Sequence, residues 1–579
     1  MKNAELASLF DKLADILEIK GENEFKVRAY RKAAMVLRGL GEPVEDFYSK
    51  GKLMELPGIG EGIAKKIAEY LETGKITKLE EESKDFPESL LEMLKIPGLG
   101  AKTVGLLYRR LGIKTVDELE RAAKSGKLLV LPGMGSRKIE KILEGIEKYR
   151  TLLSGNAEKR FLLGDVYMMI LELTDFLKEK APMERITPAG SFRRMKPTVG
   201  DIDILVSTNS PGEVMEAFKS HPEVKEILWS GESKTSVLFG ESMIQIDLRA
   251  VNPESWGAAL QYFTGSKNHN IHLREIAKKM GFKINEYGVF VEATGERIAG
   301  KTEESVYRAL GLQFIPPEMR EDWGEIELAQ NHSIPELIRY DQIKGDLHIH
   351  TRYSDGSNTI EQIVLKALEM GYSYIAITDH SQSLRVARGL EEERLRQQWK
   401  EIEELQYRYP QIKILKGSEV DILPDGSLDY PDDVLRELDF VVASVHTKFN
   451  MSEDEMTQRI IRAMENKYVT AIGHPTGRLL FKRDPYPLNV EEFLKVAAET
   501  GTFVEINSNP ERLDLEDRYI HIGKRYGVGF VISTDSHNIH QMWSIKLGVG
   551  MARRGWLTAD EILNTHDLED LTKLIYRKR

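Results

Sequence analysis

The C-terminal part of the chain, from about residue 342 onward, is a series of strand-like segments that nearly all end in a metal-binding type of side chain. "IKGDLHIH" ends at His350, "YIAITDH" at His380, "DFVVASVH" at His446 and "VGFVISTDSH" at His537. Helical patterns separate these segments, which predicts parallel βα units. The carboxyl ends of parallel strands in a βα barrel meet on one face, where the βα loops gather. We therefore expect an α/β barrel whose strand ends build one metal site.

The segment "GDLHIHTRYSDG" (345–356) carries His348 and His350 two residues apart, so both side chains point to one face of a strand, with Asp355 just beyond. One such pair is equally typical of two hydrogen-bonded structural histidines. Repetition at successive strands makes that alternative weak. The chain has no cysteine, and His, Asp and Glu donors alone suit zinc, manganese or iron. Several such ions together would activate a water for attack on phosphorus.

Residues 1–150 are expected to be helical and contain three glycine-centred turns: "LPGIGEGIAKKI" (56–67), "IPGLGAKTVGLL" (96–107) and "LPGMGSRKIEKI" (131–142). Such turns expose backbone amides at a helix N-terminus, where phosphate binds without any reading of bases. One turn alone is also typical of a plain helix–helix connection. Three, each followed by basic residues, favour a helix-hairpin-helix array on a DNA backbone. The candidate contacts are Gly58, Gly60, Gly98, Gly100, Gly133 and Gly135.

Charge and composition limit the partners. The net charge of −11 argues weakly against nucleic acid, but binding depends on local patches. The helix "KVRAYRKAA" adds Lys26, Arg28, Arg31 and Lys32 to such a patch, with a solvated helix face as the alternative. No long apolar stretch or signal peptide is evident, and the absence of cysteine fits a reducing cytoplasm.

A cluster of carboxylates is expected in the middle of the chain. "GDIDIL" places Asp201 and Asp203 on one face of a strand, and "IQIDLRA" places Asp247 on a second strand, expected to be its neighbour. No lysine partner is evident from the sequence, so divalent cations are expected to neutralise the three charges. Two Mg²⁺ ions can hold substrate phosphates for an in-line displacement at phosphorus. The alternative is a surface strand with alternating aspartates.

The motifs "AYRKAA", "LPGIG…AKKI", "GSFRR…GDID", "IDLR", "YFTGSKNHNIHLR" and "FIPPEMRED" resemble those of family X DNA polymerases over residues 1 to about 322. The resemblance implies that Asp201, Asp203 and Asp247 are the catalytic metal ligands of a nucleotidyltransferase palm. It implies nucleotide contacts from Ser191, Arg194, Gly200, Tyr262, Phe263, Gly265, Lys267 and Asn270, and a contact to template DNA from Arg274. Lys267 departs from the family pattern, because animal repair enzymes have an acidic residue there.

The same resemblance places Lys66 where animal relatives have a Schiff-base nucleophile that acts on deoxyribose phosphate. Such an amine needs a depressed pKa. The neighbouring positions that are basic in those relatives are Gly62 and Phe25 in this chain. A lysine that binds a DNA phosphate is therefore the favoured interpretation of Lys66, with lyase chemistry as the alternative.

The C-terminal pattern "DLHIHTRYSDG…TDHS…SEV…SVHT…GHP…STDSH" resembles the polymerase and histidinol phosphatase (PHP) domain family. This implies a distorted seven-stranded barrel with three ions, zinc or manganese. Asp379 is expected to orient a ligand. Two roles remain open for Arg478: it could bind the substrate phosphate, or it could form a surface salt bridge. Nine positions match the family's ligands: His348, His350, Asp355, His380, Glu419, His446, His474, Asp535 and His537.

The chain is thus expected to be a multidomain protein with an all-α N-terminal region, an α+β palm and thumb, and an α/β barrel. The expected boundaries are 1–82 and 83–150 for the two helical domains, 151–252 for the palm, 253–316 for the thumb, 317–341 for a linker and 342–579 for the PHP domain.

The predicted function is that of a monomeric, cytoplasmic DNA repair polymerase. It would add dNTPs in gapped or 3′-recessed duplex DNA, and its PHP domain would trim 3′ ends or cut abasic sites. The alternatives are a nucleotidyltransferase acting on RNA or a small molecule, and a phosphomonoesterase acting on a free metabolite.

Overall fold

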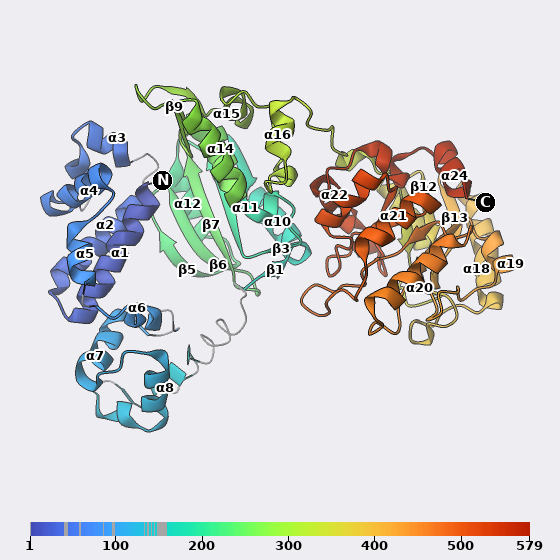
Figure 1. Ribbon diagram of the computed structural model, residues 1–579, viewed down its shortest axis with the longest axis horizontal. Coiled ribbons are helices and arrows are strands. Elements are labelled where there is room, and N and C mark those ends of the chain that lie inside the picture. The colour runs from blue at the N-terminus through green and yellow to red at the C-terminus, as the bar shows by residue number, and fades with distance from the viewer. Residues whose placement is uncertain are drawn as a thin grey trace.

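The computed structural model shows a helical N-terminal region, a central sheet and a C-terminal barrel in chain order (Figure 1). It describes residues 2–39, 44–56, 59–84, 86–94, 96, 99–131, 134–135, 138–139, 142–143, 145–146 and 159–578. This arrangement confirms the predicted fold class. Among these residues, no helix combines the length and apolar character that crossing a membrane requires.

The N-terminal region is all-helical. Its helices are α1 (Lys2–Lys20), α2 (Glu24–Gly39), α3 (Val44–Ser49), α4 (Glu61–Thr73), α5 (Thr77–Ser83), α6 (Ser89–Met93), α7 (Ala101–Leu111) and α8 (Val116–Lys124). Helix α1 packs against both α2 and α7. Its buried residues Phe10 and Leu13 belong to one apolar cluster that extends to Ile146. The two helical domains expected from the sequence therefore share a core.

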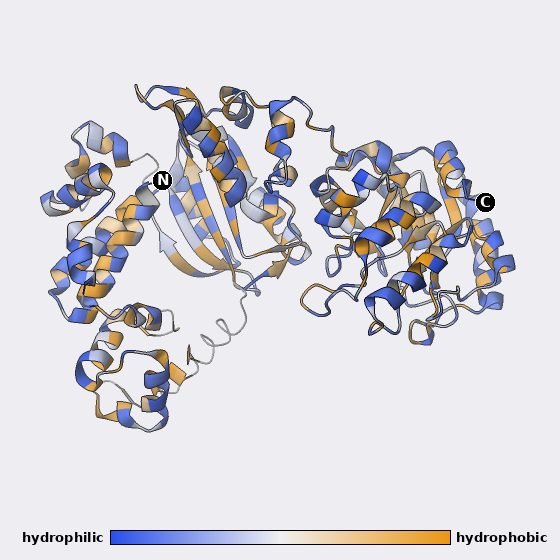
Figure 2. Cartoon of the chain, in the orientation of Figure 1, coloured by the Kyte–Doolittle hydropathy of each residue, from blue (hydrophilic) through white to orange (hydrophobic). Residues whose placement is uncertain are grey.

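The palm is a five-stranded sheet of order β2-β4-β7-β6-β5. Its strands are β2 (Arg185–Pro188), β4 (Asp201–Ser207), β5 (Val224–Ser230), β6 (Lys234–Phe239) and β7 (Ile244–Val251). Along β7, Ile244, Ile246 and Leu248 are buried and alternate with more exposed residues, among them Asp247. Helices α10 (Leu163–Lys180) and α12 (Pro211–Lys219) pack with this sheet, and Figure 2 shows apolar and polar residues alternating along its strands. This pattern leaves the carboxylates on the face away from the palm core.

The thumb follows with helices α13 (Trp256–Thr264), α14 (Lys267–Lys279) and α15 (Glu303–Ala309) and strands β8 (Phe282–Asn285), β9 (Gly288–Val291) and β10 (Arg297–Ala299). The segment predicted as a linker has regular structure: 3₁₀ turns at Pro317–Met319 and Tyr340–Gln342, and helix α16 (Glu325–Gln330). Its residues Met319 and Ile326 are buried in the thumb core. Its polar composition concealed these few apolar residues.

The barrel has seven parallel strands in sequential order: β11 (Gly345–Ile349), β12 (Tyr374–Ile377), β13 (Lys413–Asp421), β14 (Phe440–Ser444), β15 (Ala471–Ile472), β16 (Phe503–Asn507) and β17 (Phe530–Ser533). Its α-helices are α17 (Ile360–Glu369), α18 (Glu392–Arg408), α19 (Asp432–Glu437), α20 (Glu453–Glu465), α21 (Val490–Thr500), α22 (Asp517–Tyr526), α23 (Ile545–Arg554) and α24 (Leu568–Tyr576).

Among the described residues, the backbones of the first and last barrel segments share one bridge, between Ile349 and Ser536, and Asp346 also accepts from the amide of Thr534 at 3.1 Å. The buried side chain of Asn564 spans the remaining gap. Its Nδ2 donates to the carbonyls of Gly345 and Ile532 at 2.8 and 2.7 Å, and its Oδ1 accepts from the amide of Ile532 at 3.1 Å. Asn564 thus supplies bonds that an eighth strand would otherwise make.

Candidate active sites

The strand ends of the barrel bring the predicted ligands close together: seven of them line one pocket, and His348 and His350 are buried next to it. Among the residues that the structure describes, three groups have donor atoms within 4.8 Å of one another. The first is His350, Asp355, His380 and His537, the second His348, His350 and Asp535, and the third His380, Glu419 and His446. The shared members make this one connected cluster.

Glu419 lies at the centre of this cluster. Its carboxylate is 2.9 Å from Nδ1 of His380, 3.2 Å from Nε2 of His446 and 2.8 Å from Nε2 of His474. Burial alone would raise the pKa of Glu419, but the imidazoles of His446, His380 and His348 hold it well below its usual value. Glu419 is therefore a charged carboxylate in an almost fully buried position.

Several buried metal-ligand atoms of the cluster lie near one another but make no hydrogen bond of normal geometry within the described part of the chain. They are Nε2 of His348, both ring nitrogens of His350, Nδ1 of His380, Oε2 of Glu419 and Nδ1 of His474. Burial, and then the neighbouring His537 and His380, lowers the pKa of His350 to about 4, which keeps it a neutral donor. Orphaned buried polar atoms are costly unless something else binds them. This donor set fits divalent metal ions with nitrogen and oxygen ligands.

The cluster is surrounded by orienting side chains that sequence reasoning missed. Glu505 on β16 accepts from Nδ1 of His348 at 2.7 Å, and Asp421 on β13 contacts Nδ1 of His446. A ligand histidine is commonly fixed in this way by a carboxylate. Asp421 directly follows the "SEV" motif, and Glu505 lies in the strand segment "FVEIN". Asn507, also on β16, donates to Glu505 and Asp535 at 3.1 and 3.2 Å.

Asp379 lies outside the ligand groups and supports the turn that follows His350. Its carboxylate accepts from the amide and hydroxyl of Thr351 at 2.8 and 2.6 Å and from Nε2 of Gln398 at 2.5 Å. Within the described residues its carboxylate bonds no ligand side chain directly, so the orienting role stays a prediction; the link to a ligand is Ser354, whose hydroxyl contacts both Asp379 and Asp355.

Arg478 points away from the pocket. Its Nε donates to the carbonyl of Arg512 at 2.9 Å, and its Nη1 is 2.8 Å from Glu516. Arg478 thus forms a salt bridge, but a buried one rather than the surface salt bridge that was the alternative. Arg512 lines the pocket instead, with Nε 3.3 Å from Asp535 and with Nη1 buried and unpartnered among the described residues. No motif marked Arg512, because only the fold brings it to the ligands.

In the palm, the parallel pairing of β4 with β7 puts Asp203 directly opposite Asp247. Burial, and then the charges of Asp201 and Asp247, raises the pKa of Asp203 to about 7. The expectation that no lysine accompanies these acids is wrong: Nζ of Lys234 on β6 lies 2.7 Å from Asp247. Burial would raise the pKa of Asp247, but Lys234 holds it below the usual value. Lys234 thus relieves only part of the repulsion among the three carboxylates, and a divalent cation is suited to neutralise their remaining negative charge.

The turn before β4 reaches this site. Gly190 has a φ of +60°, and a Cβ there would lie 3.2 Å from Oδ2 of Asp203, so only glycine fits comfortably. The short helix α11 (Gly190–Arg193) carries Ser191. Arg194 at its end donates from Nη1 to the carbonyl of Thr264 and from Nε to Glu321 at 3.1 Å. The GSFRR and YFTGS motifs are therefore in contact.

Comparisons with known proteins show the family to which the chain belongs. Family models match for a helix-hairpin-helix domain over residues 1–76, a SAM-like helix-hairpin-helix tandem over 90–148, a DNA polymerase beta thumb over 259–321 and a PHP domain over 346–509. The chain is 41% identical, over 100% of both chains, to the DNA polymerase/3′-5′ exonuclease PolX of Bacillus subtilis. The chain belongs to the family X DNA polymerases that carry a PHP domain. It is thus a DNA polymerase with a metal-dependent 3′–5′ exonuclease domain.

More distant relatives match separate parts of this family X chain. DNA polymerase lambda of Rattus norvegicus is 24% identical over 55% of the chain and 56% of its own length. A probable phosphatase of Thermoanaerobacter sp. is 31% identical over 38% of the chain and 89% of its own length.

The remaining nucleotide-contact candidates of the family X motif gather around helices α13 and α14. Asn270 donates from Nδ2 to the carbonyl of Tyr262 at 2.7 Å, which ties it to the Tyr262–Phe263 pair. Lys267 and Arg274 are exposed on α14, and Gly200 directly precedes β4. Lys267, Asn270 and Arg274 thus lie on one helix, which begins shortly after the Tyr262–Phe263 pair.

The glycine turns open helices as predicted for the first two motifs. Gly60 is the N-cap of α4 and Gly100 the N-cap of α7, and glycine offers no side-chain acceptor to the first-turn amides. After Gly135, the described residues 138–139, 142–143 and 145–146 are helical. Gly58, Gly98 and Gly133 lie outside the described residues.

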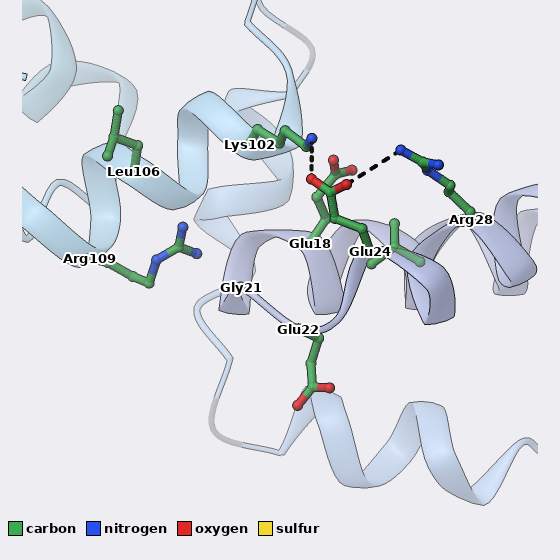
Figure 3. Close-up of a pocket in the computed structure, with 9 residues that line it drawn as sticks. Glu18, Gly21, Glu22, Glu24, Arg28, Lys102, Leu106 and Arg109 are labelled. Carbon is green, nitrogen blue, oxygen red and sulfur yellow. Dashed lines mark hydrogen bonds and ion pairs between the residues drawn. The ribbon is translucent and has the colours of Figure 1, made fainter. Parts of the chain in front are cut away.

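The basic face expected on α2 is largely neutralised. Figure 3 shows Arg28 and Lys102 both directed at Glu24. The ion pairs are 3.4 Å long for Arg28 and 2.6 Å long for Lys102. Arg31 similarly lies 2.7 Å from Asp15, and Lys26 lies 3.3 Å from Glu22. This favours the solvated-face alternative for α2.

Lys66 lies on α4 and is half-buried. Its Nζ is 3.1 Å from the carbonyl of Gly62 and lies near the ring of Tyr30.

Proposed function

We propose that the palm fills short gaps in duplex DNA, adding templated deoxynucleotides to a primer 3′-hydroxyl. The single observation that carries this is Asp203 opposite Asp247 on paired strands, next to Gly190. Two Mg²⁺ ions held by Asp201, Asp203 and Asp247 would neutralise the triphosphate and support attack in line with the leaving group. Ser191 and Arg194 would bind the phosphates, Gly200 would lie beside them, and Tyr262, Phe263 and Gly265 would line the sugar pocket. Asn270 would meet the base edge in the minor groove, and Arg274 the template. Lys267 would either stack on the incoming base or attract its phosphates.

The barrel would process 3′ ends, by trimming mismatched termini or cutting at abasic sites, with zinc or manganese as its ions. The nine ligands would hold three ions, which supply an acidified water for attack on the phosphodiester. Glu505, Asp421 and Asn507 keep the ligand side chains in place. Arg512 would bind the scissile phosphate, since a guanidinium matches phosphate geometry and its Nη1 is unpartnered within the described chain.

The N-terminal helices would hold the DNA backbone through the amides at Gly60 and Gly100 and the corresponding turn at Gly135. Contacts of this kind position DNA without reading its sequence. Lys66 would add a phosphate contact beside the first turn. The chain is proposed to act on gapped or 3′-recessed duplex DNA as a monomer.

An end-labelled duplex with a one-nucleotide gap tests the proposal when it is incubated with Mg²⁺, Mn²⁺ or Zn²⁺, with and without dNTPs. We expect extension with Mg²⁺ and dNTPs, and shortening from the 3′ end with Mn²⁺ or Zn²⁺ alone. Failure to extend a gapped primer while another nucleotidyl acceptor is used would contradict gap filling.

A second candidate for the barrel is a phosphomonoesterase, which its 31% identity to a probable phosphatase supports. Hydrolysis of a histidinol-phosphate-like substrate with no cleavage of a 3′-recessed duplex would favour it.

A further inference from the structure

The palm loop 190–196, here called the nucleotide loop, rests on the PHP barrel. It contains Ser191 and Arg194, the proposed triphosphate contacts. Helix α23 of the barrel contacts it through a buried arginine and a glycine. The turn η7 (Ile539–Ser544) reaches it indirectly, through a tryptophan that stacks on Tyr167 of α10. The loop is therefore shaped by a domain that carries a different active site.

The buried arginine is Arg554, at the end of α23, with no exposed surface. Its Nη1 donates to the backbone carbonyl of Arg194 at 2.6 Å and to Oε1 of Glu321 at 3.0 Å. Its Nε donates to Asp517 on α22 at 2.7 Å, which fixes the guanidinium within the barrel.

Glu321 links the fixed guanidinium of Arg554 to the side chain of Arg194. The same Oε1 accepts from Nε of Arg194 at 3.1 Å and lies 3.7 Å from Nζ of Lys196. Arg194 is thus held at its backbone by Arg554 and at its guanidinium by a carboxylate that Arg554 also holds. Its Nη1 meanwhile contacts Thr264, in the sugar-pocket motif.

Two apolar contacts support the same loop. A Cβ on Gly550 of α23 would lie 2.5 Å from Cε and 3.0 Å from Cβ of Met195, so glycine at this position lets the loop approach the helix. The ring of Tyr167 stacks between Phe192 of the loop, at 5.6 Å, and Trp543 of the barrel, at 5.7 Å. Both contacts act on residues beside Ser191 and Arg194.

We propose that Arg554 is a positioning residue for the polymerase: through Glu321 and the carbonyl of Arg194, the PHP barrel sets how tightly the palm binds a deoxynucleoside triphosphate. This rests on the proposed role of Arg194. An arginine held in place before binding loses less conformational freedom when it binds phosphate. Without Arg554, Glu321 keeps its charge and is free to draw the Arg194 guanidinium out of position.

The test is steady-state gap filling by the full chain with Arg554→Met, against Arg553→Met as the matched control. Arg553 is the adjacent arginine on α23; it bridges to Glu318 at 2.7 Å and to the carbonyl of Ile338 but has no described bond to the loop. We expect Arg554→Met to raise the KM for dNTP by about tenfold, equivalent to about 1.4 kcal/mol, with kcat within about twofold. Arg553→Met should leave the KM within about twofold of wild type. Arg554→Lys should restore part of the loss.

Equal KM values for the two methionine variants would overturn the proposal. If Arg554→Met fails to fold, Gly550→Ala serves instead, because it presses on Met195 without removing a charge. A Gly550→Ala enzyme with wild-type KM and intact barrel nuclease would also overturn the proposal. Arg194→Ala separates the two levels: if it leaves the KM unchanged, the proposed role of Arg194 itself fails.

Discussion

Nε of Arg512 lies 3.3 Å from the carboxylate of Asp535, so a positive charge faces the metal ligands of the barrel. An arginine in such a place favours a substrate phosphate. We expect Arg512→Met to lower kcat/KM for 3′-end removal by about 10- to 100-fold, the value of a charge-assisted hydrogen bond of about 1.5–3 kcal/mol. Measurement on a labelled 3′-recessed duplex checks this.

Arg518→Met is the control, since Arg518 is exposed and pairs with Glu516 outside the pocket. Metal content of each variant should be measured in parallel, because Arg512 touches a ligand. A loss of nuclease activity that only follows a loss of bound metal would count against phosphate binding.

The two active sites should fail separately. Asp203→Asn removes a carboxylate from the palm, and we expect gap filling to fall at least about 100-fold, since metal-held charge is worth several kcal/mol in the transition state. His446→Ala should have the corresponding effect on 3′-end removal alone. Single-turnover assays of both reactions on each variant measure this. Two independent sites would be the wrong description if either folded variant lost both activities.

Glu303 should make the stability of the contact between palm and thumb depend on pH in the acidic range. It lies 2.6 Å from Arg193 and 2.8 Å from the buried Arg320. Burial would raise its pKa, but Arg320 and Arg193 lower it to about 2. Because the pKa in the folded state is depressed, this stabilisation is present above the unfolded pKa of about 4.5 and is lost as the pH falls toward about 2.

We therefore expect Glu303→Gln to destabilise the protein by about 3–5 kcal/mol at neutral pH, because Arg320 stays buried without a charged partner. The difference from wild type should shrink between about pH 4.5 and 2. Denaturant unfolding across this range measures it, with the exposed Glu304→Gln as control. A difference that stays constant with pH would contradict this assignment.

Lys66 is expected to bind a DNA phosphate. Lys66→Ala should weaken binding to gapped DNA several-fold and reduce the salt dependence by about one phosphate contact. Lys65→Ala is the matched control, since Lys65 is exposed and pairs with Glu61 at 2.8 Å. Fluorescence titrations at several salt concentrations measure both. Borohydride trapping of an abasic-site adduct that is lost with Lys66→Ala and kept with Lys65→Ala would instead establish lyase chemistry.

The sequence by itself determined which residues meet at each strand end. Side chains alternate in direction along a strand, so residues two apart point to the same face. This applies to His348 and His350 and to Asp201 and Asp203. Parallel strands deliver their carboxyl ends to one side, so the nine barrel ligands could be predicted to converge. These inferences needed only local periodicity and strand order.

Tertiary structure alone decided the contacts between residues distant in sequence. Lys234 beside Asp247, Arg512 beside Asp535 and Asn564 in the barrel gap depend on how strands and loops pack. The bond from Arg554 to Arg194 depends on the docking of two domains. The polar segment at 317–341 became part of the thumb through buried apolar residues that include Met319 and Ile326. Local pattern carries no information about such contacts, because packing and desolvation across the whole molecule select them.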